Sequence, residues 1–352
     1  MAKPRLGVIG AGSWTVASHL PALLEHADEI EFTAVNRRGA DTLDRIRQRF
    51  GFAHAFEDYR DVLDAGVDLC VVASPTGHHH EHAKAALQAG AHVLLEKPMT
   101  IDPADAWDLV DTARRHDRHL LIAFGWNYRP MVAEFKELLD RHGIGTVEHL
   151  SVHMASVTRE LLSRRGAYAG SAEDTVPEPD TWTDPKLSGG GYAQAQLSHA
   201  LGLALWLTGL RGAQAFAFTA APLDAPVELH DAIALRFGNG AVGSVAGGSC
   251  HTGAGDNKHQ LEVRAIGSDG QIHLDVEREY AWLWRQDTDI RLPVQPEDGR
   301  YDCKGPIDTL VALAQGRDVP NRSPGELGAR TVEILDAVYR SAASGKPESC
   351  RS

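Results

Sequence analysis

The first third of the chain alternates short apolar runs with stretches in which apolar residues recur every three or four positions. The short runs are aliphatic and β-branched, as in strands buried on both faces. The spaced stretches predict helices with one apolar face. Strict alternation of the two predicts parallel strands joined by helical crossovers, and hence an α/β fold with a doubly wound sheet. The strands are predicted at 6–9, 31–35, 68–73, 92–95 and 119–123, and the helices at 19–26, 40–50, 79–89 and 103–115.

The pattern changes after residue 125, where alternating apolar and polar positions become common. Gly238-Asn239-Gly240 predicts a hairpin turn, because these residue types tolerate left-handed backbone. We therefore expect a dinucleotide-binding domain over 1–125 and, over 126–352, a second α/β domain with a large, mostly antiparallel open sheet. The strands are predicted at 146–156, 228–237, 241–250, 260–266, 271–276 and 280–285, and helices at about 131–141 and 324–343.

Two further segments of the second half bear on the domain organisation. The polar stretch from Arg159 to Ser188 is too long for a simple connection, and it predicts a lid or a wall of the site. The helix predicted at about 324–343 is the last predicted element, and it can pack against the first domain.

Composition excludes several classes of function. The chain has 35 basic and 48 acidic residues, a formal charge of −13, which disfavours nucleic acid and anionic membranes as partners. No apolar run approaches the roughly 20 residues that span a bilayer, and the N-terminus lacks a signal-peptide core. The four cysteines show no CxxC spacing, so we expect reduced thiols. These features predict a cytoplasmic protein.

A glycine turn follows the first predicted strand. Gly10 permits a tight turn, and Gly12 lets the backbone approach a pyrophosphate at the start of the next helix. Because the run Gly10-Ala11-Gly12-Ser13-Trp14-Thr15 lies between a strand and a helix, it predicts dinucleotide binding.

The end of the second strand bears on the choice of cofactor. Asn36 stands where an NAD enzyme often places a carboxylate on the ribose, and Arg37 and Arg38 can hold a 2′-phosphate. The pattern favours NADP. If both arginines belong to a solvated loop, NAD remains possible.

Lys97 is the first candidate for chemistry. It follows the strand at 92–95 directly, at the carboxyl end of the sheet where such folds bind ligands, and Pro98 restricts its backbone. The run from His78 to His82 could suggest a metal, but a solvated helix start explains it, and we predict no metal site. His251 and His259 flank a glycine-rich loop that could reach the mouth of the site.

Several short motifs recur in a recognisable order. They are Gly10-Ala11-Gly12, Ser74-Pro75-Thr76 with His79, Ala89 to Val93, Glu96-Lys97-Pro98, Asn127-Tyr128-Arg129, Trp182, Ser188 to Gly191, His199 and Trp206 to Gly209. This order resembles the Gfo/Idh/MocA family, named for glucose-fructose oxidoreductase, inositol dehydrogenase and a rhizopine catabolism protein. The resemblance implies an N-terminal Rossmann domain and hydride transfer between a nicotinamide and a ring carbon of a sugar, cyclitol or related polyol. It also implies that Lys97 is the catalytic lysine and His199 the acid or base at the substrate hydroxyl.

Elementary chemistry agrees with these roles. Oxidation of an alcohol needs a base for the hydroxyl proton, and histidine titrates nearest to neutrality. The ammonium of Lys97 would stabilise the developing alkoxide. The chain departs from the family where dehydrogenases usually carry aspartates around this histidine, since it has Ala195 and Gly202, and Thr183 replaces an arginine after Trp182.

The candidate residues fall into two further groups. The expected cofactor-binding residues are Gly10, Gly12, Ser13, Trp14, Asn36, Arg37, Arg38, Ser74, Pro75, Thr76, His79, Glu96, Lys97 and Asn127. The expected substrate-binding residues are Tyr128, Arg129, Trp182, Asp184, Lys186 and Gln196.

Two alternatives stay open at this point. The missing aspartates would also suit redox-neutral chemistry on a sugar, such as elimination, glycoside cleavage or epimerisation with tightly bound NAD, and a non-catalytic nucleotide-binding protein could keep the same fold. In every case an apolar open sheet face predicts a homo-oligomer, a dimer or a tetramer.

Overall fold

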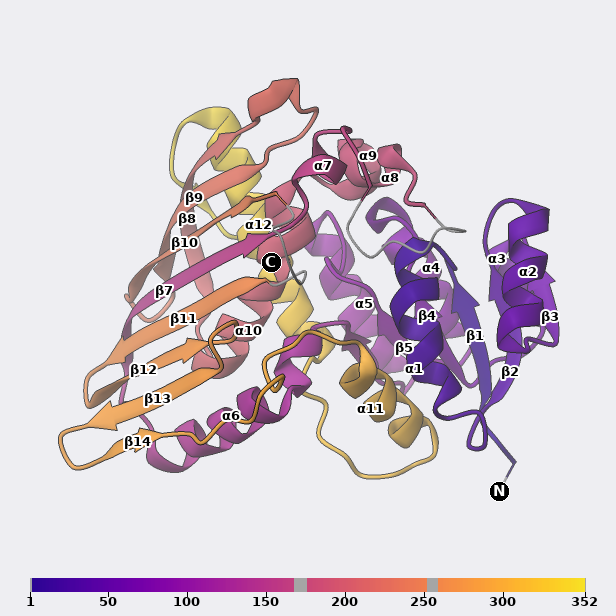
Figure 1. The fold of residues 1–352 in the computed structure, drawn as a ribbon, viewed down its shortest axis with the longest axis horizontal. Coiled ribbons are helices and arrows are strands. Elements are labelled where there is room, and N and C mark those ends of the chain that lie inside the picture. Colours follow the sequence, from indigo (N-terminus) through magenta and orange to yellow (C-terminus); the bar gives the residue numbers. More distant parts are fainter. Residues whose placement is uncertain (1, 168–175, 252–258, 352) are drawn as a thin grey trace.

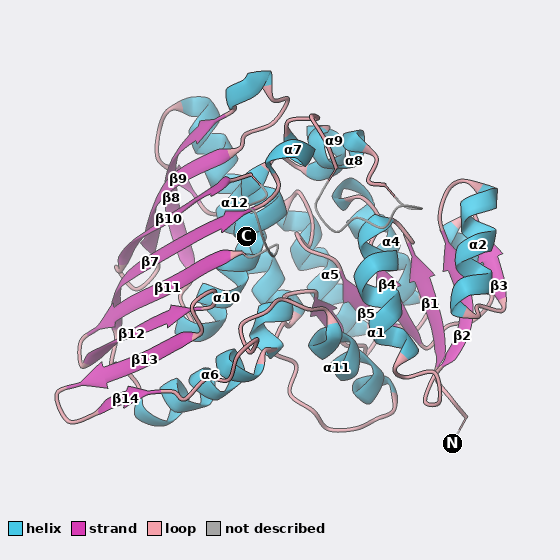
Figure 2. Cartoon of the chain, viewed as in Figure 1, coloured by secondary structure: helices cyan, strands magenta, loops and turns pink. Residues whose placement is uncertain are grey.

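The computed structural model describes residues 2–167, 176–251 and 259–351 (Figure 1). Within these ranges the strands form two sheets, one of six strands and one of nine. Figure 2 shows the two sheets on opposite sides of a layer of helices. The predicted α/β architecture is confirmed.

The six-stranded sheet has the order β3-β2-β1-β4-β5-β6, and every neighbouring pair is parallel. Its strands are β1 (Arg5–Ile9), β2 (Glu31–Asn36), β3 (His54–Phe56), β4 (Leu69–Val72), β5 (His92–Leu95) and β6 (Leu120–Ile122). Its helical segments are η1 (Thr15–His19), α1 (Leu20–Leu24), α2 (Ala40–Phe50), α3 (Tyr59–Asp64), η2 (Thr76–His78), α4 (His79–Gln88), α5 (Pro103–Arg115) and η3 (Gly125–Tyr128). This is the doubly wound sheet that the alternation of elements predicts.

Local chemistry fixes the helix boundaries. The Asp102 carboxylate accepts a hydrogen bond of 2.8 Å from the backbone of Ala104, and Pro103 occupies the first helical position, so α5 begins where the sequence predicts. The helix predicted at 19–26 begins earlier, with the π-helical turn η1 from Thr15. β3 and α3 escaped prediction because they are short and carry little apolar periodicity.

The nine-stranded sheet has the order β14-β13-β12-β11-β7-β10-β9-β8-β15. Among the described strands of this sheet, only the β7–β10 pair is parallel, so the expected mostly antiparallel sheet is confirmed. The predicted turn at Gly238-Asn239-Gly240 joins β9 to β10. The strands are β7 (Val147–Ser156), β8 (Gly212–Ala220), β9 (His230–Phe237), β10 (Val242–Ser249), β11 (Gln260–Gly267), β12 (Gly270–Asp275), β13 (Tyr280–Arg285), β14 (Asp289–Arg291) and β15 (Glu348–Ser349).

Helices cover one face of the nine-stranded sheet and connect it to the six-stranded sheet (Figure 1). Helix α12 contacts α5 of the first domain and β8 of the second sheet, and Trp107 Nε1 donates to Glu333 Oε1 at 2.7 Å between α5 and α12. Helix α10 (Ser198–Thr208) is buried on nearly all sides, since it lies between the two sheets. These segments are α6 (Pro130–His142), α7 (Arg159–Leu162), α8 (Pro179–Thr183), α9 (Pro185–Ser188), η4 (Ala193–Leu197), α10 (Ser198–Thr208), η5 (Pro222–Asp224), α11 (Lys304–Ala314) and α12 (Gly325–Ser344).

The outward face of the nine-stranded sheet carries large apolar side chains. Phe218, Val242 and Ile266 are 69%, 50% and 47% exposed, and the rings of Trp282 and Trp284 stack at 3.8 Å on β13. Alternation along each strand turns these side chains away from the helical layer.

None of the helices in the described ranges combines the length and apolarity of a membrane span. All four cysteines are described, and each is a free thiol.

Candidate active site

A cavity of about 780 Å³ lies at the carboxyl ends of β1, β2, β4 and β5, and extends to the N-terminal part of α10. It brings together most residues that the sequence analysis selected. Those that line it are Gly10, Gly12, Ser13, Trp14, Asn36, Arg37, Arg38, Ser74, Pro75, Thr76, His79, Glu96, Lys97, Trp182, Gln196 and His199. The motifs therefore converge on one site, although they are spread over nearly 200 positions.

Asn127 and Tyr128 do not line this cavity, contrary to expectation. The side-chain amide of Asn127 is buried and donates to the carbonyl of Arg322 at 3.0 Å. The hydroxyl of Tyr128 lies 2.8 Å from Ser323 Oγ. Both side chains fasten the segment before α12 to the end of the first sheet.

Arg129, Asp184 and Lys186 are also absent from the cavity wall. Arg129 forms an ion pair with Asp302 and donates to nearby backbone carbonyls. Asp184 accepts from the backbone N–H of Lys186 at 3.0 Å, which caps α9. The side chains of Arg129 and Asp184 thus hold loops, and the assignment of these three residues to the substrate stays a prediction.

Several aromatic side chains line the cavity without having been selected as site residues from sequence, and three of them lie near His199. Trp126, His259 and Tyr301 surround its inner end. Of the two histidines that flank the glycine-rich loop, His259 reaches the cavity, while His251 bonds Glu160 Oε1 at 2.6 Å. Tyr301 lies in a segment without periodic pattern, so no sequence signal indicated it.

The glycine turn has the geometry that a pyrophosphate needs. Gly10 has φ of +89°, and a Cβ there would meet the backbone of Ser74 at 2.4 Å, so this position requires glycine. A Cβ at Gly12 would have no neighbour within 4 Å and would project into open space beside the cavity. The backbone is therefore bare where a phosphate approaches the start of the helix, and the residues fit a dinucleotide.

Asn36 has a different role from the one expected. Its side-chain nitrogen donates to the carbonyls of Phe56 and Glu57 at 3.0 and 2.9 Å, which ties the ends of β2 and β3 together. A carboxylate could not donate these bonds. Glu57 in turn accepts from the backbone of Gly39 at 2.7 Å and so fixes the loop that carries Arg37 and Arg38.

Glu96 lines the cavity next to Lys97. Its Oε1 lies 2.6 Å from His19 Nε2 and accepts from Trp14 Nε1 at 3.0 Å. Burial alone would raise the pKa of Glu96, but the hydrogen bond and charge of His19, with Lys97, lower it. Burial would likewise lower the pKa of His19, but Cys303 and Glu96 outweigh it and raise that pKa to about 10. The pair is therefore an imidazolium and a carboxylate at neutral pH.

Lys97 reaches across the cavity to the second domain. Its Nζ donates to the carbonyl of Ala195 at 2.7 Å, which joins the end of β5 to the turn before α10. Burial lowers the pKa of Lys97, while the carboxylate of Glu96 opposes the shift. The ammonium is near enough to His199 and His259 for its charge to lower the pKa of both rings.

His199 lies in an aromatic enclosure. The rings of Trp126 and Tyr301 meet it edge-on at 5.2 and 5.1 Å, and Phe124 lies 6.4 Å away. Its Nδ1 is buried and has no hydrogen-bond partner among the described residues. Burial first, and then the charge of Lys97, hold the pKa of His199 well below its usual value. The ring is neutral at physiological pH and can accept a proton.

The structure accounts for the departures around His199. A Cβ at Gly202 would lie 2.9 Å from the ring of Phe124, so an aspartate there would require that ring to move. Ala195 instead contributes its carbonyl, which holds Lys97. Thr183 is buried and accepts from Arg164 Nε at 2.7 Å. Aromatic packing thus replaces the carboxylates expected beside the histidine.

Two groups of potential metal ligands lie at or beside the cavity. His19, Glu96 and Cys303 place ligand atoms within 4.8 Å of one another, but His19 and Glu96 already bond each other, and only Glu96 of the three lines the cavity. His78 and His82 both line the cavity, where their rings stack at 5.6 Å, and His82 Nδ1 lies 2.9 Å from Ser74 Oγ.

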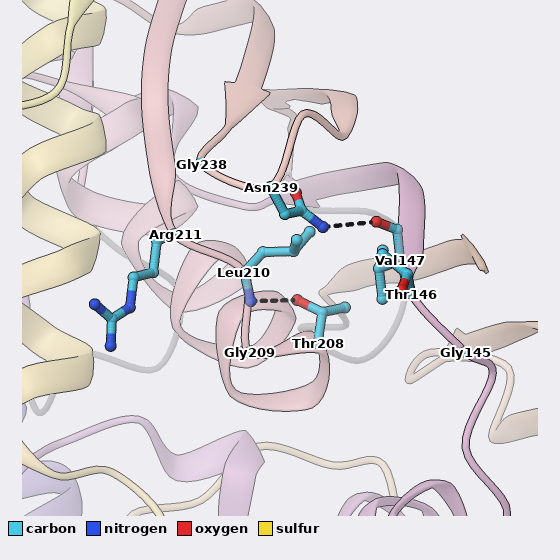
Figure 3. Close-up of a pocket in the computed structure, with 9 residues that line it drawn as sticks. All are labelled: Gly145, Thr146, Val147, Thr208, Gly209, Leu210, Arg211, Gly238 and Asn239. Atoms are coloured by element: carbon cyan, nitrogen blue, oxygen red, sulfur yellow. Dashed lines mark hydrogen bonds between the residues drawn. The ribbon is translucent and has the colours of Figure 1, made fainter. Parts of the chain in front are cut away.

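A second cavity of about 560 Å³ lies among the loops that precede β7 and β8 (Figure 3). Asn239 Nδ2 donates to the carbonyl of Val147 at 2.9 Å across it. Arg211, the titratable residue in its wall, points away from the others in Figure 3. This cavity brings no acid or base groups together.

Comparison with known proteins agrees with the geometry. Residues 4–124 match the family model described as "Oxidoreductase family, NAD-binding Rossmann fold", and residues 132–273 match "GFO/IDH/MocA C-terminal domain". The chain is 32% identical over 151 residues to glucose-6-phosphate 3-dehydrogenase of Bacillus subtilis, covering 42% of this chain and 41% of that protein. It is 26% identical over 256 residues to levoglucosan dehydrogenase of Pseudarthrobacter phenanthrenivorans, covering 66% and 61%.

The fold is also that of solved dehydrogenases. The WlbA dehydrogenase of Bordetella pertussis, in complex with NADH and UDP-GlcNAcA, superposes over 100% of both chains with a TM-score of 0.76 at 22% identity. The matched segments span about two-fifths and three-fifths of the two curated relatives. With both domain models matched in order and the lysine, histidine and glycine turn in one cavity, the chain belongs to the Gfo/Idh/MocA oxidoreductase family.

Proposed function

We propose that the protein is an NAD(P)-dependent dehydrogenase that oxidises a ring hydroxyl of a sugar, cyclitol or related polyol. The convergence of Lys97 and His199 at the inner end of a dinucleotide cavity carries this proposal. The named relatives act on sugars, which supports the substrate class.

The chemistry divides between cofactor and protein. When bound, the nicotinamide supplies the hydride acceptor. His199, neutral because of its apolar surroundings, takes the hydroxyl proton of the substrate. Lys97 turns its ammonium from the Ala195 carbonyl to the same oxygen and stabilises the negative charge that develops there. The imidazolium–carboxylate pair of His19 and Glu96 holds Lys97 in place, because Glu96 Oε2 accepts from the Lys97 backbone at 3.0 Å.

The inner cavity suits a sugar ring. Trp126, Trp182 and Tyr301 offer aromatic faces to C–H surfaces, and Gln196 offers a donor and an acceptor to hydroxyl groups. We assign Trp182 and Gln196 to substrate binding, and add Trp126, Tyr301 and His259.

The cofactor end favours NADP over NAD. Arg37 and Arg38 line the cavity at the end of β2, where the adenosine ribose lies in such folds, and position 36 itself carries no carboxylate. Two carboxylates also line the cavity, but Glu57 accepts from the backbone of Gly39 and Asp58 pairs with Arg60. Arg60 lines the same end of the cavity. NADP is therefore the proposed cofactor, with NAD as the weaker alternative.

The test is to incubate the purified protein with NADP or NAD and a panel of sugars and inositols, and to follow the absorbance of reduced nicotinamide. We expect turnover with at least one pair and a drop of about 100-fold or more in kcat for Lys97→Met, without loss of cofactor affinity. Lys84→Met, whose side chain pairs with Asp108 outside the cavity, is the matched control.

Other outcomes of this test assign other functions. Cofactor that survives purification, with turnover but no net reduced nicotinamide, would indicate redox-neutral sugar chemistry. Cofactor binding with no turnover on any substrate, and no effect of Lys97→Met, would indicate a nucleotide-binding protein without catalysis.

A further inference from the structure

A buried carboxylate outside the cavity holds a second glycine-rich turn, Ser188 to Gly191, which precedes His199 in the sequence. The two oxygens of Glu228 each accept from the backbone of Gly191 at 2.9 Å, and Oε1 accepts from Ala193 at 3.2 Å. The carbonyl of Glu228 accepts from Tyr192 at 3.0 Å. Glu228 thus satisfies the backbone donors at and just before the start of η4, which continues into α10.

Tyr339 of α12 completes this anchor. Its hydroxyl donates to Glu228 Oε1 at 2.6 Å and accepts from the backbone of Gln194 at 3.2 Å. A Cβ at Gly190 would lie 2.2 Å from this hydroxyl, and one at Gly191 would lie 2.3 Å from the carbonyl of Glu228. The glycine run is therefore required for close approach to the anchor.

The anchored segment carries the groups that meet the substrate. Ala195, whose carbonyl holds Lys97, follows the turn by four residues, and His199 follows it by eight. Both belong to the continuous helix formed by η4 and α10, so a displacement of the turn moves both.

A second carboxylate lies beside Glu228 and lacks partners. Asp231 on β9 is 5% exposed, and neither of its oxygens has a hydrogen-bond partner among the described residues. Its cross-strand neighbours are Thr219 on β8 and Gly247 on β10, which do not titrate.

The groups that interact electrostatically with Asp231 are acidic. They are Glu228, Tyr192 just before η4 and Tyr339 of α12, and no cation is among them in the described part of the chain. Burial first, and then the charge of Glu228, raise the pKa of Asp231 to about 8. Two ionised carboxylates without a counter-charge are costly in such surroundings, so the pair shares one negative charge at neutral pH.

We propose that Glu228 is a positioning residue for the dehydrogenase reaction, and that Asp231 keeps a proton so that the Glu228 carboxylate alone holds the turn before His199. This inference rests on the proposed function for its kinetic consequences. Ionisation of Asp231 adds a second negative charge beside Glu228 and loosens the anchor, so Ala195 and His199 lose their alignment with Lys97.

Three variants test the proposal. Glu228→Gln places an amide opposite backbone donors, and Tyr339→Phe removes one hydroxyl; we expect each to lower kcat/KM about tenfold or more at pH 7, with the cofactor Kd unchanged. Asp231→Asn should keep the wild-type rate at pH 7 and retain it above pH 8, where the wild type declines. If Glu228→Gln does not fold, Tyr339→Phe decides, because it alters a single atom of the anchor.

A matched control and an activity-independent readout complete the experiment. Glu333→Gln changes another buried carboxylate, bonded to Trp107 rather than to the turn, and should leave the rate unchanged. The NMR signal of the His199 ring, recorded without substrate, should move in Glu228→Gln and not in Glu333→Gln. If no sugar is oxidised, the proposed function fails, but this signal still decides the positioning role. Unchanged rates and an unmoved His199 signal in both anchor variants, or an Asp231→Asn profile that declines with the wild type above pH 8, would overturn the proposal.

Discussion

Replacing Asp231 with asparagine should remove a large pH dependence from the stability of the folded protein. The pKa of Asp231 is raised from 3.8 to about 8 by burial and by Glu228. Below pH 3.8 this carboxyl group is protonated in both states. As the pH rises, the unfolded chain releases its proton while the folded chain keeps it, so stability falls until about pH 8.

The magnitude follows from the width of this interval. One additional proton on the folded state makes the free energy of unfolding fall by about 1.4 kcal/mol for each unit of pH. Between 3.8 and about 8 the loss amounts to about 6 kcal/mol, and between pH 5.5 and 7.5 to about 3 kcal/mol. Asparagine resembles the protonated carboxyl group and carries no proton to lose. The two proteins should therefore differ little in acid, and the variant should be the more stable at neutral and alkaline pH.

Unfolding in urea, followed by circular dichroism at pH 5.5, 6.5 and 7.5, measures this difference. The gap in stability between Asp231→Asn and the wild type should widen steadily with pH. Asp224→Asn, at an exposed position in the connection that leads from β8 to β9, serves as control and should show a constant gap. A gap for Asp231→Asn that does not change with pH would refute the assignment of a proton to the Glu228–Asp231 pair.

Three other predictions concern the cofactor, the base and the assembly. Arg38→Gln should weaken NADP binding about 10- to 100-fold, which corresponds to the free energy of one charge-assisted hydrogen bond, and should leave NAD binding unchanged. Calorimetry measures both affinities, and equal effects on the two cofactors would contradict a contact between Arg38 and the 2′-phosphate. Because His199 must be neutral to act as a base and its pKa is lowered, kcat/KM for oxidation should hold as the pH falls and decline only below 6.5, and an acidic limb above that value would exclude this role. The apolar outward face of the nine-stranded sheet should associate with a second copy of the chain. Analytical ultracentrifugation should find a dimer or tetramer at micromolar concentration, and Phe218→Asp should weaken it. A wild-type monomer would contradict this prediction.

The sequence predicts the elements with strong periodicity and misses those without it. The predicted boundaries of α2, α5 and β13 agree with the structure, because their apolar positions repeat clearly and turns bound them. β8 escaped prediction because glycine and alanine, which are depleted in strands, occupy five of its nine positions. Nearly every position of α10 is apolar, so the sequence shows no helical periodicity there. Only the end of the helix at Gly209 could be recognised.

The candidate site follows the same division. Gly10 and Lys97 could be selected because each follows a predicted strand, and the family resemblance implied His199; all three line the cavity. Tyr128 and Arg129 were expected at the substrate but do not line the cavity, since their hydrogen bonds reach segments about 170 to 195 residues away that the sequence cannot place beside them.

A crystal structure with NADP and the most rapidly oxidised sugar tests the central claim most directly. We predict that the pyrophosphate lies on the turn at Gly10 and Gly12, and that the reacting hydroxyl oxygen lies within about 3 Å of both Lys97 Nζ and a ring nitrogen of His199. A dinucleotide bound elsewhere, or a sugar whose reacting oxygen contacts neither group, would contradict the account.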